Sequence, residues 1–297
     1  MEVLTKNRSV SRVVVATKTM EGDGVPIRRV FPARALEDID PFLLLDEMGP
    51  LELAPGSRTG FPDHPHRGFE TVTYVLEGEM EHRDSRGNHG VLGPGDVQWM
   101  TAGAGLVHSE MPGSELQRNG GRLHGFQLWV NLPRRDKMIA PQYQELPGPR
   151  IPVARDAARR VEVRIVAGES LGGRALIQTR TPIAYLHFTL QPGGAHQQTV
   201  PQGWNAFAYV IDGEVDLGAG AGAVAAGHMA LFSKDGDAVT LSNPASAARP
   251  ASALLIAGAP LGEPVARYGP FVMTTRDEIV QAVDDYRNGR MGTIALR

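Results

Sequence analysis

The sequence predicts an all-β protein built of two similar β-barrels and ending in a short α-helix. Glycine and proline, 35 and 22 of the 297 residues, are spread along the chain as turn residues, as short-stranded β proteins require. The segment 74–81 is echoed by the segment 209–216, so one β-unit occurs twice. Near the C-terminus, Thr275 and Glu278 stand in a capping-box pattern, which begins a helix.

The duplicated unit can be followed through its turns. Both copies, YVLEGEME and YVIDGEVD, read as a strand, a turn with an acidic residue and glycine, and a return strand. Prolines then cluster between residues 131 and 149. We therefore expect a first barrel over 1–133, a linker over 134–150, and a second barrel over 151–297. In the terminal helix, Ile279, Val283 and Tyr286 form an apolar stripe that docks against a barrel.

Composition narrows the class of protein. The net charge of −3 gives no reason to expect binding to nucleic acid or to an anionic membrane. The sequence has no cysteine, which excludes disulfides and thiolate metal centres. Residues 1–6 lack a signal-type apolar core, and the apolar runs are too short to cross a bilayer. We expect a monomer in the cytoplasm.

Two histidine-bearing segments of the first copy predict a metal site. His64 and His66 are two residues apart, so an extended segment places both imidazoles on one face. His108 and Glu110 have the same spacing. If two strands bring these pairs together, three imidazoles and a carboxylate converge on one divalent cation. Such a set with open positions suits Fe(II), although Zn, Mn, Ni or Cu can bind it too. By strand parity alone, Glu70 is an alternative carboxylate ligand.

The amino-acid sequence of these segments resembles that of a known family. The histidine pairs and the Pro-Gly-Asp turn between them are similar to the two motifs of the cupin superfamily. The stretches DHPHRGFETVTYVLEGE, GPGDVQWMTAGAGLVHSEMP and QLWVNLP resemble the pirin family in particular, including its bacterial quercetin 2,3-dioxygenase-like members. The resemblance implies two tandem jelly-roll-type cupin barrels, and one iron ion held by His64, His66, His108 and Glu110. The resemblance also implies that Glu70 is not a ligand, and that it supports the ligands from behind or makes a structural hydrogen bond.

The resemblance also implies the surroundings of the metal. Asp46 and Phe61 correspond to residues that wall the pocket in this family, at the usual place for a small ligand in a barrel mouth. Four protein ligands leave two positions of an octahedral ion open. We expect Glu110 to act as base as well as ligand, because a carboxylate that swings off the metal can accept a phenolic proton.

The second copy lacks this ligand set. Laid over the first, it has His196 opposite His64, Gln198 opposite His66, Thr240 opposite His108 and Ser242 opposite Glu110. Because amide and hydroxyl groups are poor ligands for a transition metal, we expect a metal-free second barrel. The remaining histidines have no partner at ligand spacing, which favours solvated or hydrogen-bonded residues: His82, His89, His124, His187 and His228.

Two functions follow from the resemblance. The first is a dioxygenase that opens a quercetin-type flavonol, or another enolic aromatic substrate, with O₂ and releases CO. The alternative is an iron-dependent regulatory protein that binds a transcription factor or a metabolic enzyme. A complete ligand set fits both, because a redox-switched binding protein also needs its metal.

Overall fold

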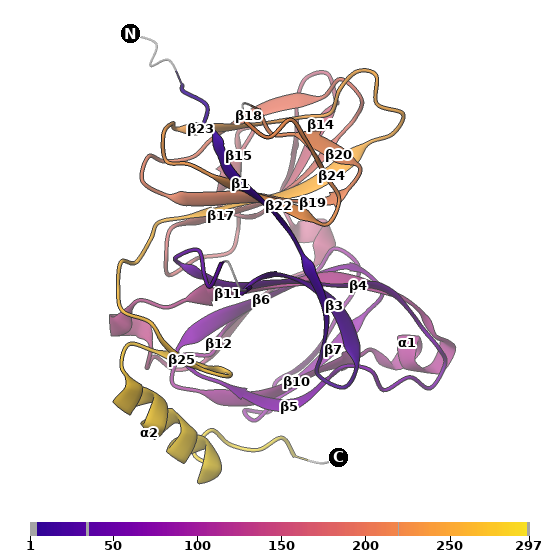
Figure 1. Ribbon diagram of the computed structural model, residues 1–297. Coiled ribbons are helices and arrows are strands. Elements are labelled where there is room, and N and C mark those ends of the chain that lie inside the picture. Colours follow the sequence, from indigo (N-terminus) through magenta and orange to yellow (C-terminus); the bar gives the residue numbers. More distant parts are fainter. Residues whose placement is uncertain (1–4, 34–35, 219, 296–297) are drawn as a thin grey trace. The chain divides into compact units, whose positions relative to one another are not determined.

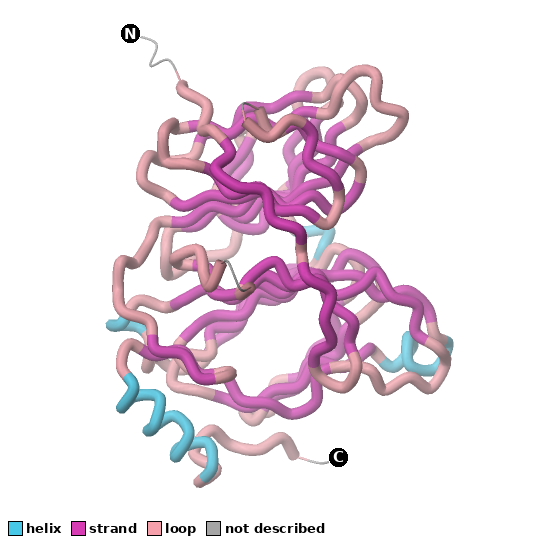
Figure 2. The backbone as a smooth tube through the Cα atoms, viewed as in Figure 1, coloured by secondary structure: helices cyan, strands magenta, loops and turns pink. Residues whose placement is uncertain are grey.

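The computed structural model describes residues 5–33, 36–218 and 220–295, and these form two compact units (Figure 1). The first barrel unit consists of Thr17–Arg150 and Leu261–Arg297, and the second barrel unit of Met1–Ala16 and Ile151–Pro260. Strands dominate both units, whereas helices are few and short (Figure 2). The helical segments are α1 (Ser114–Asn119), α2 (Arg276–Arg287) and 3-10 turns at Arg134–Asp136 and Gly148–Arg150. The predicted all-β class with a short C-terminal helix is confirmed.

The first barrel unit contains two facing sheets. The larger one runs in the order β12 (Gln142–Leu146), β9 (Val97–Thr101), β6 (Phe69–Glu77), β11 (Gly121–Asn131), β4 (Phe42–Leu53), β3 (Val25–Phe31) and β2 (Thr17–Glu21). The smaller one runs in the order β5 (Phe61–His66), β10 (Leu106–Pro112), β7 (Met80–Asp84) and β8 (His89–Leu92). A separate hairpin, β25 (Ala266–Tyr268) and β26 (Phe271–Met273), belongs to the same unit.

The second barrel unit repeats this arrangement. Its larger sheet runs in the order β1 (Val10–Val15), β22 (His228–Phe232), β19 (Asn205–Asp212), β24 (Ala251–Gly258), β17 (Ile183–Leu190), β14 (Val161–Ala167) and β13 (Val153–Arg155). Its smaller sheet runs in the order β18 (Ala195–Thr199), β23 (Ala238–Ser242), β20 (Glu214–Asp216) and β21 (Ala223–Ala225). A separate two-stranded sheet, β15 (Glu169–Ser170) and β16 (Gly173–Arg174), belongs to the same unit.

The strand orders of the two units correspond except at one edge of the larger sheets, where β12 follows the other strands of its sheet in the chain and β1 precedes those of its own. This correspondence is the structural form of the sequence duplication. The repeated turn has the same backbone in both copies, because Gly78 and Gly213 adopt φ values of 79° and 73°. Such angles favour glycine. In each unit the main strands form two separate sheets rather than one continuous closed barrel, so the architecture is a jelly-roll-like sandwich.

Both ends of the chain depart from the boundaries expected from the sequence. Strand β1, near the N-terminus, pairs antiparallel with β22 and so extends the larger sheet of the second unit. Residues beyond 260 belong to the first unit. There α2 and the segment after it share an apolar cluster with Val107 of β10, and the Asp285 carboxylate accepts a 2.6 Å bond from Arg67. Strand pairing and burial of apolar side chains, rather than position in the sequence, therefore decide which unit each end of the chain joins.

Helix α2 begins as its sequence predicts. Thr275 and Glu278 form the complete capping box, and Ile279 and Val283 pack against the apolar cluster of the first unit. Among the described residues, helices such as α1 and α2 fall short of the length and apolar content that crossing a bilayer requires.

Candidate metal centre

Neighbouring strands of the smaller sheet bring three histidines together in the first unit. Strands β5 and β10 are antiparallel, with His64 directly opposite His108. His66 follows on the same face of β5, and its Nε2 lies 3.1 Å from Nε2 of His64. One ring nitrogen from each of the three side chains lies within 4.8 Å of the others. The convergence that the spacing predicted for the imidazoles is therefore present.

The protonation of His66 and His108 suits metal binding. His66 and His108 are buried. Burial above all, and then the neighbouring histidines, lowers the pKa of each well below its ordinary value. Both rings are therefore neutral at neutral pH, and neutral imidazole is the form that binds a metal. The Nε2 atom of His108 is also buried without a hydrogen-bond partner among the described residues, an arrangement that a bound cation would satisfy.

A chain of hydrogen bonds behind His108 fixes which of its nitrogens faces the cluster. The Tyr143 hydroxyl donates to Oδ2 of Asp84 at 2.7 Å, so it can accept from His82 Nε2, which lies 3.1 Å away. The Nδ1 atom of His82 is then an acceptor, 3.4 Å from Nδ1 of His108. Nδ1 of His108 consequently carries the proton, and its Nε2 keeps the lone pair. Orienting bonds of this kind are typical behind metal-binding histidines.

His82 is a residue whose role sequence reasoning missed. Its spacing gives no sign of a partner, yet the side chain is almost fully buried and reaches His108 from the neighbouring strand β7. The sequence does show that His82 and Asp84 are two residues apart and so share a face of β7. This spacing points to a role beside His108 only once β7 is known to pair with β10. His64 is oriented more simply, because its Nδ1 lies 2.7 Å from the carbonyl oxygen of Pro62.

Glu110 lies on β10 but stands apart from the tight cluster. Among the described residues, the set whose ligand atoms all lie within 4.8 Å of one another contains the three histidines and no carboxylate. The Glu110 carboxylate is buried and accepts bonds from Thr73 Oγ1 at 2.8 Å and from Gln127 Nε2 at 2.9 and 3.1 Å. Its place as the fourth ligand stays a prediction.

Glu70 takes part in a different set of contacts. Its Oε1 accepts a 2.6 Å hydrogen bond from Thr101 on β9. Residues 70 and 73 of β6 differ in parity, so Glu70 lies on the opposite face of this strand from Thr73, which contacts Glu110. The strand thus directs Glu70 away from the face that carries the Glu110 contact.

A cavity of about 520 Å³ opens beside His64 and His66. Asp46 and Phe61, which the sequence placed in the pocket wall, both line it. Asp46 is held by a two-pronged contact from Arg29, with N–O distances of 2.9 and 2.7 Å. The remaining lining comes from several elements of the same unit: Glu21, Gly22, Asp23, Leu44, Pro62, Asp63, Gln127, Trp129, Arg267, Gly269 and Pro270.

The second unit has a different interior at the corresponding place. His196 lies opposite Leu241, which is the register position of His108, so the alignment of Thr240 with His108 was wrong by one residue. The His196 ring packs on Phe188, and its Nε2 lies 3.2 Å from the Gln198 amide oxygen. Leu241 and Phe188 belong to a large apolar core. An aliphatic side chain thus occupies the position of the third ligand.

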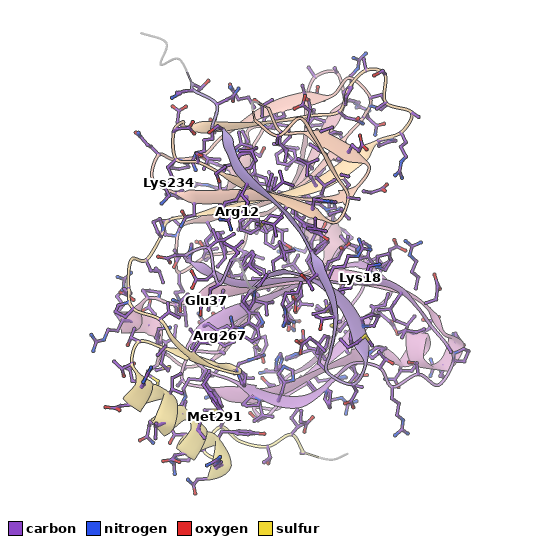
Figure 3. The ribbon with its side chains drawn as sticks, in the orientation of Figure 1. Arg12, Lys18, Glu37, Lys234, Arg267 and Met291 are labelled. Carbon is purple, nitrogen blue, oxygen red and sulfur yellow. The ribbon has the colours of Figure 1, made fainter. Side chains whose placement is uncertain are left out.

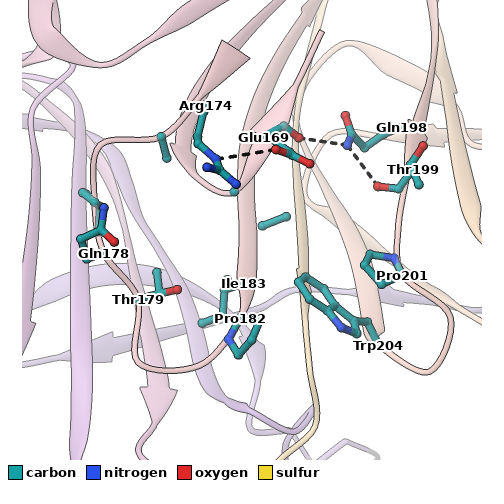
Figure 4. Close-up of a pocket in the computed structure, with 14 residues that line it drawn as sticks. Glu169, Arg174, Gln178, Thr179, Pro182, Ile183, Gln198, Thr199, Pro201 and Trp204 are labelled. Carbon is teal, nitrogen blue, oxygen red and sulfur yellow. Dashed lines mark hydrogen bonds and ion pairs between the residues drawn. The ribbon is translucent and has the colours of Figure 1, made fainter. Parts of the chain in front are cut away.

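The second unit nevertheless has a cavity of about 470 Å³ (Figure 4). Trp204, Pro182 and Ile183 form an apolar wall, and Glu169 and Arg174 stand on the other side. The Gln198 amide donates to the carbonyls of Glu169 and Thr199, so it serves the local backbone. Among the described residues that line this cavity there is no histidine.

The fold and the three-histidine cluster define a two-domain cupin protein that could hold a metal. The Pirin domain matches residues 24–130, and the Pirin C-terminal cupin domain matches residues 185–292. The chain belongs to the pirin family. It is 46% identical over 290 residues to a pirin-like protein of Solanum lycopersicum, covering 98% of this chain and 95% of that one. To mouse pirin it is 45% identical, covering 97% and 96%.

A solved structure matches over the whole chain as well. The crystal structure of a quercetin 2,3-dioxygenase from Acinetobacter baumannii has a TM-score of 0.90 and 34% sequence identity to this chain. The match covers 98% of this chain and 100% of that protein. The family resemblance drawn from the sequence is thus confirmed.

Proposed function

We propose that this protein is an Fe(II)-dependent dioxygenase that opens a quercetin-type flavonol or another enolic aromatic compound with O₂. The observation that carries the proposal is the cluster of three histidines, two of which, His64 and His66, line a cavity that also has aromatic walls, Phe61 and Trp129. The likeness to a quercetin 2,3-dioxygenase over the whole chain supports it. Zn, Mn, Ni and Cu remain alternatives for the resident metal.

In this proposal the ligands are His64, His66, His108 and Glu110. A bound ferrous ion would supply redox chemistry toward O₂ and acidify an enolic hydroxyl. The His82–Tyr143–Asp84 chain keeps the lone pair of His108 Nε2 directed at the cluster. Glu110 is ligand and base: Thr73 and Gln127 hold its carboxylate, which accepts the enolic proton.

Other residues of the cavity would position the organic substrate. The Trp129 ring is held in place, because its Nε1 donates to Gln127 Oε1 at 3.1 Å and its face packs on Phe69 with ring centres 4.4 Å apart. A flat aromatic substrate can pack against this immobilised wall with little loss of side-chain entropy. Leu44 and Phe61 add apolar wall that keeps water from the enolic oxygen.

Turnover of quercetin by the iron-loaded protein tests the proposal. Protein reconstituted with Fe(II) without oxygen and then mixed with quercetin and O₂ should consume oxygen, release CO and lose the flavonol absorbance. His66→Gln and Glu110→Gln should abolish turnover while circular dichroism stays unchanged. Glu70→Gln is the matched control and should keep it, because Glu70 contacts Thr101 on the far face of β6.

Absence of oxygen uptake by fully iron-loaded protein, across a panel of flavonols and related enols, would refute the enzymatic proposal. The iron-dependent regulatory role would then be the better account. A pull-down from cell extract with iron-loaded and metal-free protein, with His66→Gln as control, tests that role directly.

A further inference from the structure

The cavity beside the histidines contains two arginines in different electrostatic situations. Arg29 of β3 is neutralised by carboxylates, since it contacts Asp46 through two nitrogens and Glu21 at 2.8 Å through a third. Arg267 of β25 comes from the C-terminal segment that returns to the first unit (Figure 3). The fold thus adds a second cation to this wall.

Among the described residues, Arg267 has no carboxylate in ion-pair contact. Its guanidinium lies over the Trp129 ring, 5.0 Å from the ring centre, and donates to the carbonyl oxygen of Leu43 at 3.1 Å. Within the described part of the chain, no carboxylate oxygen comes within 4.0 Å of its nitrogens, and Asp46, Asp38 and Glu37 act on it only at longer range. Since a guanidinium has five N–H donors, several are available to a ligand.

One aromatic ring separates this cation from the histidines. The Trp129 ring that carries Arg267 packs edge-on against His66, with ring centres 5.1 Å apart. A single-ring aromatic ligand along this wall could therefore place one end near the histidines and the other near the guanidinium. The cavity also has carboxylates in its lining, Glu21, Asp23, Asp46 and Asp63, which disfavour a ligand with more than one negative charge.

We propose that Arg267 forms an anion-binding subsite, and that the cavity selects an enolic or phenolic aromatic compound that carries one carboxylate. The carboxylate pairs with Arg267, the ring lies along Trp129, and the enolic or phenolic oxygens face the histidines. The placing of these oxygens rests on the proposed function, whereas the charge preference rests on Arg267 alone.

Binding to zinc-loaded protein tests the subsite without turnover, because zinc has no redox chemistry. The probes share one catechol ring: 3,4-dihydroxybenzoate, its uncharged methyl ester, and the dianionic 3,4-dihydroxybenzyl phosphate. Isothermal titration should give affinity for the benzoate about 10- to 100-fold above the ester, the range of a hydrogen bond to a charged group. The phosphate should bind more weakly than the benzoate.

Substitutions test whether Arg267 causes the preference for the benzoate over the ester. Arg267→Gln should remove the advantage of benzoate over ester, and Arg267→Lys should keep part of it, with zinc content and melting temperature as checks of folding. Arg174→Gln, an exposed arginine of the second unit, is the matched control and should bind like wild type. The proposal is overturned if wild type binds the benzoate and the ester equally, or does not measurably bind the benzoate. It is overturned as well if the phosphate binds more tightly than the benzoate, or if Arg267→Gln keeps the preference for the benzoate. Flavonol turnover is measured separately, so a failure here leaves the dioxygenase proposal to its own test.

Discussion

Replacing Glu110 by glutamine should weaken metal binding by more than about 100-fold, or about 2.7 kcal/mol, because that is the upper end for losing a residue behind a ligand. Glutamine has nearly the same size, and an amide oxygen at the place of Oε1 can still accept from Thr73 and Gln127. The change therefore removes the anionic ligand with little disturbance of packing.

Two further variants set the scale for this loss. Thr73→Val removes one donor to the Glu110 carboxylate while both Gln127 contacts remain, so we expect a loss of about 10-fold, the lower end for such residues. Glu70→Gln keeps an acceptor for Thr101 on the opposite face of β6, so its effect should stay below that 10-fold limit.

Metal affinity is measured by competition with a chromophoric chelator at neutral pH, with zinc and then cobalt, from metal-free protein. Circular dichroism and thermal melting show whether each variant is folded. The expected order of loss is Glu110→Gln, then Thr73→Val, then Glu70→Gln. A folded Glu70→Gln protein that purifies without metal, beside a Glu110→Gln protein with wild-type affinity, would refute the assignment of Glu110 as ligand.

Four more outcomes can be checked on the same preparations. Elemental analysis should give one transition-metal ion per chain, since Leu241 occupies the third ligand position of the second unit, and two tightly held ions would contradict this. His82→Phe should weaken metal binding by about 10- to 100-fold, because His108 Nδ1 loses its acceptor, with exposed His89→Phe as control. The metal-free protein should lose stability as pH falls below about 6.5, at up to about 1.4 kcal/mol per pH unit for each of His66 and His108. The unfolded chain takes up these protons first, because burial lowers the pKa of both residues in the folded state. Denaturant titrations at several pH values should show that the free energy of unfolding of metal-free His66→Gln depends less steeply on pH than that of wild type. Zinc-loaded wild type should release its ion steeply on acidification, with uptake of more than one proton.

The histidine cluster was predictable because it depends on local backbone geometry. His64 and His66 share a face of any extended strand, and the pairing of β5 with β10 brings His108 directly opposite. The duplication and the capping box of α2 are local in the same sense, since each is written within a few consecutive residues. The sequence comparison failed by one residue at Thr240, where alignment without strand register put the wrong residue opposite His108.

Contacts between distant segments were decided only by the tertiary structure. Arg267 reaches the cavity, and β1 pairs with β22, because sheet edges and apolar surfaces are covered by whichever segment fits them, whatever its position in the chain. His82 contacts His108 only because β7 is the neighbour of β10. The sequence by itself determined which side chains share a strand face, since alternation is a property of each strand alone. The order in which strands lie side by side follows from the packing of the whole sheet, so the residues behind the ligands and around the cavity could be found only in the folded chain.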